Sequence, residues 1–351
     1  MATFSIPNVK LVGISACVPK KIISNSKHPY FSEEQMSAFI SSTGVNERRI
    51  AESSQTTADF CLEAAEDLIK KLAWDKSEID VLIFVSQTAD YKLPVTSAIL
   101  QDRLGLPTTC LAMDIPLGCS GYVYGISSIA SLLSLGPLKK GLLLVGETNS
   151  KVVSPYDKST EPLFGDAGTA SAFIYDPSSK PIPFDLGTDG SGYKAIIIPA
   201  GGSRNLADEK AMEYVKVEEG ITRNQCSLVM DGMDVFSFGI SKAPSNVRDL
   251  LAYTNRDIES IDHFVFHQAN LFMNNKITKK LKIPSEKVPY TLGKYGNTSS
   301  ATIPLTIVSE LKDSLSNSRA DILCCGFGVG LSWGSCILNT ENLIINDIRE
   351  I

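Results

Sequence analysis

Two stretches of the chain share one pattern, in which a polar start leads into an unbroken run of β-forming apolar residues. They are residues 77–87 and 259–268, and each leads into a helix-like stretch that ends in a similar sequence, LGLP in one case and LKIP in the other. A further apolar run comes later in each half, at residues 141–146 and 321–326. Because these runs are continuous rather than alternating, they predict strands in sheets that are covered on both faces.

The landmarks recur in the same order at nearly equal spacing, which indicates an internal duplication. The two copies meet near residues 175–185, in a connector that is rich in proline and serine. We therefore expect an N-terminal half of residues 1–178 and a C-terminal half of residues 179–351. Strand and helix alternate in both, so the fold class is α/β.

Composition and charge exclude several classes of protein. The chain has 351 residues, 43 % of them hydrophobic and 21 % charged, which fits a globular protein and excludes a disordered or fibrous one. A formal net charge of −6 argues against nucleic acid as the partner. No apolar run approaches the ~18 residues of a membrane helix, and the first residues lack the pattern of a secretion signal. The eight cysteines show no Cys-x-x-Cys spacing, so we expect reduced thiols, a cytoplasmic protein and no metal site.

Cys119 is the candidate nucleophile. It follows Gly118 and precedes a stretch of small and apolar residues that stops at Gly136 and Pro137, which places it at the start of a buried helix. At that position the helix dipole and free N–H groups are expected to lower the thiol pKa. The alternative is that Cys119 is a small buried hydrophobe, as most cysteines are. The remaining cysteines look structural.

His267 and Asn297 are the candidate partners of Cys119. His267 lies at the end of the strand equivalent to the one that ends at Ser86 and Gln87, and Asn297 follows Gly296 as Cys119 follows Gly118. In a two-fold arrangement such positions can converge on one cavity at the strand ends. The alternatives are a hydrogen-bonded core histidine and a helix-capping asparagine. Of the other histidines, His28 is expected to be solvated and His263 to be structural.

The glycine-rich segment at residues 326–334 resembles a dinucleotide loop only superficially. A β-like stretch follows it, and no helix or spaced acidic residue does. We interpret the segment as a tight turn whose backbone N–H groups approach a reactive site, as an oxyanion hole requires.

Together these motifs resemble the thiolase superfamily, and most closely its β-ketoacyl-acyl-carrier-protein synthase III branch. The resemblance covers nearly the whole chain. It rests on Gly118-Cys119-Ser120-Gly121, Phe164-Gly165-Asp166-Ala167-Gly168, Met230-x-Gly232, His267-Gln268-Ala269-Asn270, Gly296-Asn297-Thr298-Ser299 and Gly326-Phe327-Gly328-Val329-Gly330-x-x-Trp333-Gly334. It implies a thiolase-like duplicated five-layered αβαβα sandwich, which is usually a homodimer.

The resemblance also implies a reaction. Cys119 would take an acyl group from an acyl thioester, with its own N–H and that of Val329 as the oxyanion hole. His267 and Asn297 would hold the carbonyl of malonyl-acyl-carrier protein as neutral donors. Loss of CO2 would give an enolate, whose attack on acyl-Cys119 would yield a 3-oxoacyl-carrier protein. No cofactor is implied beyond coenzyme A or carrier-protein thioesters as substrates.

Several positions depart from the pattern of the resembled family. Phe39, Ser42 and Lys158 stand where a Trp and two Arg commonly grip coenzyme A, so a carrier-protein donor is an alternative. Leu93 replaces a Phe that usually enters the partner's acyl pocket. The positions that agree with the pantetheine tunnel are Asn270 and Phe236.

A basic patch follows Asn270 in the sequence. Its lysines, Lys276, Lys279 and Lys280, suit an acidic acyl carrier protein, although Phe272 stands where an Arg is expected. A solvated helix face is the alternative for such a patch.

Two other functions are alternatives for the chain. The first is an acyltransferase of the same superfamily that does not decarboxylate its substrate. The second is a cysteine hydrolase, since Cys119, His267 and Asn297 occur in the papain order, but the residues around Cys119 do not fit the papain pattern. A non-catalytic scaffold fits poorly because all three candidate residues are present.

Overall fold

The computed structural model describes residues 2–26 and 28–351. One sheet holds the strands β2 (Val9–Val18), β5 (Val81–Val85), β6 (Leu111–Ile115), β7 (Lys140–Glu147), β8 (Ala167–Tyr175), β17 (Ile344–Ile345) and β18 (Arg349–Glu350). Their order is β17-β2-β8-β7-β5-β6, and β18 also pairs with β2. All five residues of β5 are buried, as its continuous apolar run predicts for a sheet covered on both faces.

The second sheet has five strands and repeats the plan of the first. It consists of β1 (Ala2–Ile6), β9 (Ile182–Thr188), β14 (His263–Phe266), β15 (Arg319–Gly328) and β16 (Ser332–Glu341). Their order is β1-β9-β16-β15-β14. The run β9-β16-β15-β14 therefore matches β2-β8-β7-β5, with a parallel pair (β14 with β15, β5 with β7) at the same place in each.

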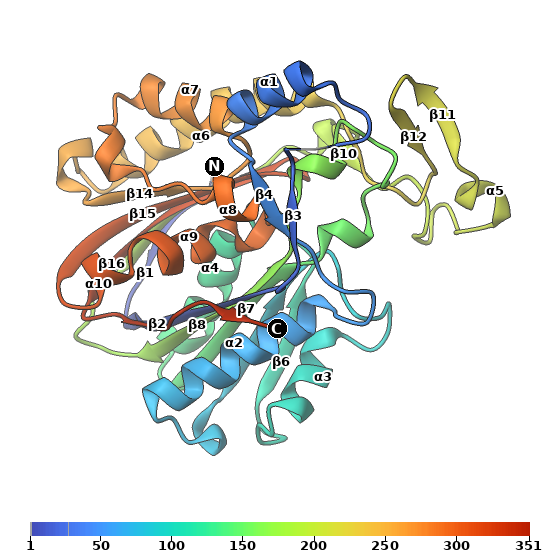
Figure 1. Cartoon of the computed structure of the whole chain (residues 1–351). Helices are drawn as coiled ribbons and strands as arrows, with labels where there is room; N and C mark the ends of the chain where they lie inside the picture. The colour runs from blue at the N-terminus through green and yellow to red at the C-terminus, as the bar shows by residue number, and fades with distance from the viewer. Residues whose placement is uncertain (1, 27) are drawn as a thin grey trace.

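Helices form three layers around the two sheets (Figure 1). The central layer holds α4 (Gly121–Ser134) and α9 (Thr302–Glu310), which both contact strands of both sheets. The outer helices are α2 (Thr57–Leu72) and α3 (Thr96–Arg103) on the first sheet and α6 (Gly232–Tyr253) and α7 (Leu271–Leu281) on the second. This confirms the expected duplicated five-layered αβαβα sandwich.

The core lies where the layers meet. A large cluster of buried side chains joins α4 and α9 to the inner faces of both sheets, while two others lie under α2 and α6. The helix α4 is apolar on nearly all sides because it is central, and it stops before Gly136, whose φ of 92° suits a glycine. The predicted helix after Cys119 is thus confirmed.

Each end of the chain contributes a strand to the sheet of the other half. β1 pairs with β9 of the second sheet, whereas β17 and β18 pair with β2 of the first. The connector at residues 176–181 joins β8 to β9, so it lies between the two sheets in the sequence.

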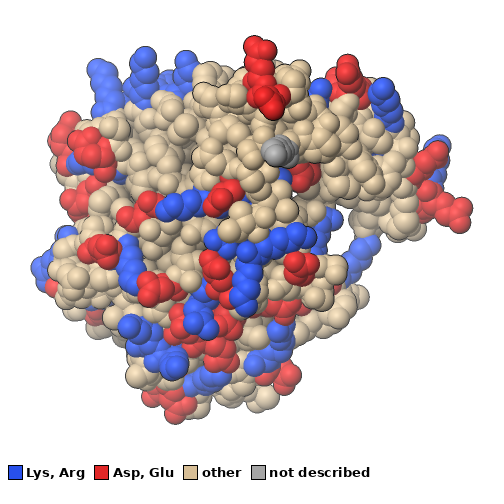
Figure 2. Space-filling model, viewed as in Figure 1, with Lys and Arg blue, Asp and Glu red and all other residues tan. Residues whose placement is uncertain are grey.

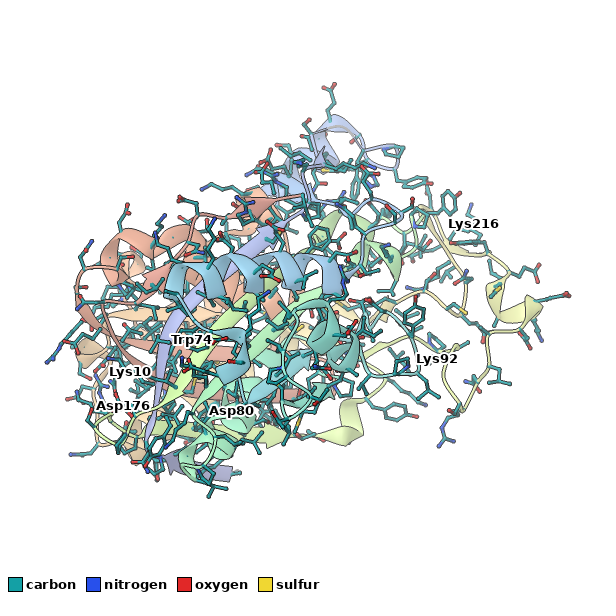
Figure 3. The ribbon with its side chains drawn as sticks, turned by 90° about the horizontal axis from the view of Figure 1, so that it is seen from below. Lys10, Trp74, Asp80, Lys92, Asp176 and Lys216 are labelled. Atoms are coloured by element: carbon teal, nitrogen blue, oxygen red, sulfur yellow. The ribbon has the colours of Figure 1, made fainter. Side chains whose placement is uncertain are left out.

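The remaining elements belong to neither of the two large sheets. They are β3 (Ile22–Ser24), α1 (Glu33–Thr43), β4 (Glu47–Arg49), β10 (Ile196–Ile197), α5 (Glu209–Met212), β13 (Val229–Met230), α8 (Leu292–Tyr295) and α10 (Lys312–Leu315). A hairpin of β11 (Val215–Glu218) and β12 (Ile221–Arg223) projects from the sandwich. Lys216 of this hairpin and Lys92 lie toward one end of the molecule, while Lys10 and Asp176, beside the connector, lie toward the other (Figure 3).

Candidate active site

Cys119 lies directly before the first turn of α4 and is 9 % exposed. Glycines at the end of β15 allow this strand to reach it. A Cβ atom on Gly328 would lie 2.6 Å from Cβ of Cys119, and one on Gly326 would lie 2.8 Å from its carbonyl oxygen. The strand end can approach so closely only because these residues have no side chain.

The turn between β15 and β16 also closes on the residue before Cys119. A Cβ atom on Gly118 would lie 2.7 Å from Cγ1 of Val329 and 2.3 Å from Oε1 of Gln87. The glycine-rich segment is therefore a tight turn beside Cys119, as the sequence predicted.

The acidity of the thiol differs from the prediction. Burial raises the pKa of Cys119 to about 11, and the hydroxyl of Ser299 and the backbone N–H of Val329 lower it by less. The backbone N–H groups of Val329 and Cys119 lower the pKa as expected, but burial outweighs them, so the net shift is upward rather than downward. The desolvation free energy of the buried thiolate is larger than the stabilisation that the nearby hydrogen-bond donors provide.

His267 lies where β14 ends, and its buried ring is nearly perpendicular to that of Phe327, at 5.6 Å between centroids. Its Nδ1 lies 2.8 Å from Oγ1 of Thr302, and its backbone N–H donates to the carbonyl of Cys325 at 2.8 Å. Burial lowers the pKa of His267 to about 3. The imidazole is therefore neutral at ordinary pH.

Asn297 is buried and held at both its backbone and its side chain. Its backbone N–H donates to the carbonyl of Leu163 at 2.9 Å. Its Oδ1 accepts the N–H of Ser299 at 2.8 Å, and its Nδ2 donates to the carbonyl of Ala269 at 3.4 Å. The amide nitrogen thus points toward the segment that follows His267.

Ser299 is the residue that joins these three, and it was not predicted to have a role. Its Oγ lies 3.7 Å from Sγ of Cys119, its N–H donates to Asn297, and its carbonyl oxygen lies 2.8 Å from the hydroxyl oxygen of Thr302, which contacts His267. The Gly-Asn-Thr-Ser run was visible in the sequence, but no pattern in it indicates that Ser299 reaches across to α4.

Glu147 was also missed. Its fully buried carboxylate accepts from the backbone N–H of Gln87 at 3.1 Å, from the hydroxyls of Ser86 and Thr88 at 3.2 and 2.9 Å, and from that of Ser300 at 3.2 Å. Burial raises its pKa to about 7. The sequence held one signal: an acidic residue directly follows the apolar run at residues 141–146.

The strand pairing explains where Glu147 lies. Val85 pairs with Val145, as Phe266 pairs with Cys325. Extended by one residue, this register places Ser86 opposite Gly146 and His267 opposite Gly326. Each side chain contacts the next residue along the facing strand, Glu147 in the first half and Phe327 in the second. The predicted equivalence of the strand that ends at His267 with the one that ends at Ser86 and Gln87 therefore agrees with the register.

Two residues of the predicted pantetheine tunnel lie near α7. Asn270 is the N-cap of this helix, where its side chain accepts the N–H of Met273 at 2.8 Å. Phe236 stacks on Phe272 at 5.5 Å, and Nζ of Lys276 lies 5.2 Å from the centre of that second ring. Asn270 thus also stabilises the start of α7 as its N-cap. Lys276 places a positive charge beside Phe272, the position where an Arg was expected.

The predicted docking lysines are exposed on the outer face of α7. These residues are Lys276, Lys279 and Lys280. Figure 2 shows basic side chains that project from the upper left of the molecule, over this helix. Leu93 is 85 % exposed and lies in the loop between β5 and α3, so this subunit does not bury it in a pocket of its own.

Two residues that were predicted to lie at the coenzyme A site contact other parts of this chain. Lys158 packs against the hairpin, because a Cβ atom on Gly220 would lie 2.6 Å from its Cδ. Its N–H donates to the carbonyl of Gly220 at 3.0 Å. Phe39 packs on Phe31 at 5.5 Å and on a small apolar cluster around Phe164.

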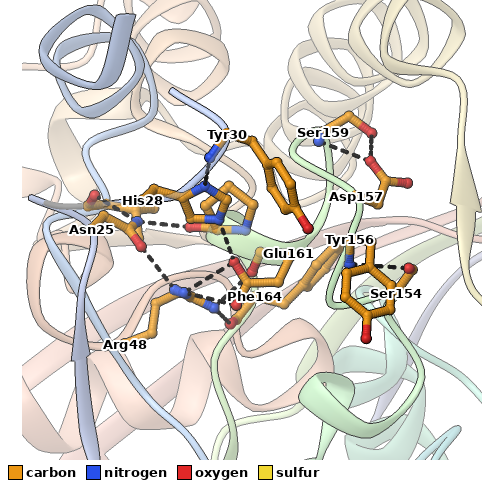
Figure 4. Close-up of polar contacts among 12 residues, drawn as sticks. Asn25, His28, Tyr30, Arg48, Ser154, Tyr156, Asp157, Ser159, Glu161 and Phe164 are labelled. Atoms are coloured by element: carbon orange, nitrogen blue, oxygen red, sulfur yellow. Dashed lines mark hydrogen bonds and ion pairs between the residues drawn. The ribbon is translucent and has the colours of Figure 1, made fainter. Parts of the chain in front are cut away.

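His28 contradicts the expectation that it is solvated. Its Nε2 lies 2.9 Å from Glu161, which also binds Arg48 at 3.1 Å, while Asn25 accepts from Arg48 at 3.1 Å (Figure 4). The side chain of His28 is 8 % exposed. Its partner is more than a hundred residues away in the sequence, so no local pattern could reveal the burial.

Two kinds of feature are absent from residues 2–26 and 28–351. This part of the chain holds no group of three or more metal-ligating side chains. It also holds no helix with the length and apolar character needed to cross a membrane.

Comparison with known proteins agrees with this geometry. Residues 113–190 match the family described as 3-oxoacyl-[acyl-carrier-protein (ACP)] synthase III, and residues 251–340 match its C-terminal family. The chain is 32 % identical to beta-ketoacyl-[acyl-carrier-protein] synthase III of Natranaerobius thermophilus, over 94 % of this chain and 99 % of that protein.

Solved structures show the same similarity. A 3-oxoacyl-(acyl-carrier protein) synthase from Burkholderia xenovorans LB400 is 40 % identical, with a TM-score of 0.93 over 100 % of this chain and 99 % of that one. Synthase III from Pseudomonas aeruginosa PAO1 is 28 % identical, with a TM-score of 0.84 over 96 % and 99 %. The chain therefore belongs to the β-ketoacyl-acyl-carrier-protein synthase III family, whose members are thiolase-like condensing acyltransferases of fatty-acid biosynthesis.

Proposed function

We propose that Cys119 carries the acyl group of the reaction, and that His267 and Asn297 activate the malonyl thioester. The observation that supports this most directly is the convergence of all three on Ser299, which brings the start of α4 beside the ends of β14 and α8. The thiol of Cys119 attacks the acyl thioester, and the donor thiol leaves. The N–H groups of Cys119 and Val329 stabilise the oxyanion of that step.

The second half-reaction needs donors that do not protonate carbon. Neutral His267 and the amide of Asn297 meet this need, because they can bind the thioester oxygen as CO2 leaves and the enolate forms. The electrons of the broken C–C bond then form the new bond from the enolate carbon to the acyl carbon. The thiolate of Cys119 is the leaving group.

Acyl carrier protein is the proposed partner, and α7 is its docking surface. Lys276, Lys279 and Lys280 offer positive charge on a protein of net charge −6, which suits an acidic partner. The pantetheine arm would pass Phe236 and Asn270. Acyl- and malonyl-thioesters are the only co-substrates of this scheme.

The acyl donor is proposed to be carrier-bound rather than coenzyme A-bound. Phe39 is half-buried in the apolar cluster around Phe164, and the side chain of Lys158 lies along the hairpin. Neither presents a free planar cation to a nucleotide, so the far end of coenzyme A lacks the grip that an Arg provides.

A homodimer completes the proposal. β6 is an edge strand of the first sheet, and the nearby loop exposes Tyr91, Leu93 and Val95. An open strand edge beside a group of exposed apolar side chains favours pairing with a second copy. Leu93 would then reach the acyl pocket of the partner. The free cysteines suit a reducing compartment such as the cytoplasm.

Mass spectrometry tests the acyl-enzyme step. After incubation with a panel of acyl thioesters, one acyl mass per chain is expected on the peptide that contains Cys119. Cys119→Ser should abolish the adduct, whereas a label on Cys324 or Cys325 would overturn the assignment. Release of CO2 from malonyl-carrier protein separates condensation from acyl transfer without decarboxylation.

A further inference from the structure

The hydroxyl of Ser299 contacts the reacting atom of Cys119. Its Oγ lies 3.7 Å from Sγ, within the longer range of hydrogen bonds to sulfur, and both residues are buried. Among residues 2–26 and 28–351, no other side chain forms a hydrogen bond to this sulfur. Ser299 belongs to the C-terminal half of the chain, so the contact joins the two copies of the duplication.

The backbone of Ser299 is held on both sides. Its N–H donates to Oδ1 of Asn297 at 2.8 Å, and its carbonyl oxygen lies 2.8 Å from the hydroxyl oxygen of Thr302. Its φ is 51°, in the left-handed region that non-glycine residues seldom adopt. Such a conformation persists only where the surroundings determine it, and here it keeps the side chain beside Sγ.

We propose that Ser299 is a further catalytic residue, whose hydroxyl donates a hydrogen bond to the thiolate of Cys119. The inference rests on the proposed function, because it assigns a task within the same site. Ser299 keeps its own proton throughout. The half-reaction exchanges one thiol for another: the Cys119 sulfur bonds to the acyl carbon, the old thioester bond breaks, and the proton lost from Cys119 ends on the departing donor thiol.

The need for such a donor follows from the burial of the sulfur. Burial raises the pKa of Cys119, and the bond from Ser299 is the largest influence that lowers it. A hydroxyl serves here because it stabilises a thiolate without adding a charge to the cavity. The same bond assists when the thiolate leaves at the end of condensation. It has no task in the loss of CO2, where no charge forms on sulfur.

Two variants test the proposal against a matched control. Ser299→Ala removes the hydroxyl, and Ser299→Gly removes it while relieving the positive φ. Ser120→Ala is the control, because its buried hydroxyl bonds to Ser332 at 2.7 Å, and Ser120 is the neighbour of Cys119 in the sequence. Thermal unfolding of all three variants establishes that they fold.

The readout is the rate at which iodoacetamide alkylates Cys119 as pH is varied, followed on its peptide by mass spectrometry. Both Ser299 variants should move the midpoint upward by about one pH unit, the tenfold effect of one hydrogen bond to a charged group. Their acylation at pH 7 should slow by a similar factor, with CO2 release from malonyl-carrier protein unchanged. Ser120→Ala should match the wild type.

An unchanged alkylation midpoint in both Ser299 variants would overturn the proposal. Equal slowing of acylation and CO2 release would overturn it too, since that result indicates a general disturbance of the site. If the wild type formed no acyl-enzyme with any thioester, the proposed function would fail, whereas the alkylation profiles would still decide whether Ser299 stabilises the thiolate.

Discussion

Nδ1 of His267 lies 2.8 Å from the hydroxyl oxygen of Thr302, in the first turn of α9. A neutral imidazole carries a hydrogen on only one nitrogen, so a hydroxyl that donates to Nδ1 leaves the ring hydrogen on Nε2, as a donor role requires. Thr302 Oγ1 also lies 2.8 Å from the carbonyl of Ser299, to which it can donate instead. The direction of this one hydroxyl thus selects the tautomer of His267.

The first prediction follows from this contact. Thr302→Val keeps the shape of the side chain but removes the hydroxyl, so condensation should slow at least about tenfold while acylation of Cys119 is unchanged. Thr302→Ser should restore condensation. Stopped assays of acyl-enzyme and of 3-oxoacyl product measure the two steps. Normal condensation by the valine variant would contradict the assignment.

His267 and Asn297 give a second prediction. His267→Ala and Asn297→Ala should each acylate Cys119 but condense about 10²–10³-fold more slowly, the usual cost of one lost oxyanion donor. The reason is that both side chains are placed to bind the enolate oxygen. Normal release of CO2 from malonyl-carrier protein by both variants would show that the roles are wrong.

Glu147 makes the stability of the protein depend on pH. Burial raises its pKa from an ordinary 4.5 to about 7, so the folded chain keeps a proton that the unfolded chain releases. The stabilisation by this group is complete below pH 4.5 and declines, by about 3 kcal/mol in all, as pH rises to 7. The lowered pKa of His267 gives the opposite trend, with stability rising from about pH 3 to 6.5.

Urea unfolding of wild type and Glu147→Gln at pH 4.5 and 7.5 isolates the carboxyl, because the His267 contribution is common to both. The free-energy advantage of the wild type over the variant should shrink as pH rises. Glu147→Asp, which keeps a buried carboxyl, should retain the trend. An advantage that grew with pH would mean that Glu147 is ionised when the chain is folded.

The lysines of α7 give a fourth prediction. Lys279→Glu with Lys280→Glu should remove a preference for acyl-carrier protein over the matching acyl-coenzyme A, measured as kcat/KM, and added salt should weaken that preference in the wild type by screening. The control is the same reversal of Lys70 and Lys71, an exposed pair at the end of α2. Equal use of both donors, insensitive to salt and to either reversal, would show that ordinary coenzyme A priming survives.

Much of the sandwich could be predicted because its signals are local. The continuous apolar run of β5 and the small apolar residues of α4 follow directly from burial on several faces, and Gly136 ends the helix where expected. The order of repeated landmarks then indicates two similar sheets. The placement of Cys119 and His267 at the ends of such elements follows from the same reasoning.

Other properties depend on contacts that only the folded chain makes. The raised pKa of Cys119 results from packing against β15, and the burial of His28 requires Glu161. Ser299 reaches Cys119 across the boundary between the halves. No helix or strand signal reports any of these contacts, because each joins residues that are far apart in the sequence.

The exchange of terminal strands has a consequence for the boundary between residues 178 and 179, which stays a prediction. A chain cut in the connector would leave β1 on one fragment and its neighbour β9 on the other, while β17 and β18 would be separated from β2. Each fragment would therefore lack an edge strand of its own sheet and carry one that belongs to the other. The two halves are similar in plan but interlocked, so they would regain their structure only by fragment complementation.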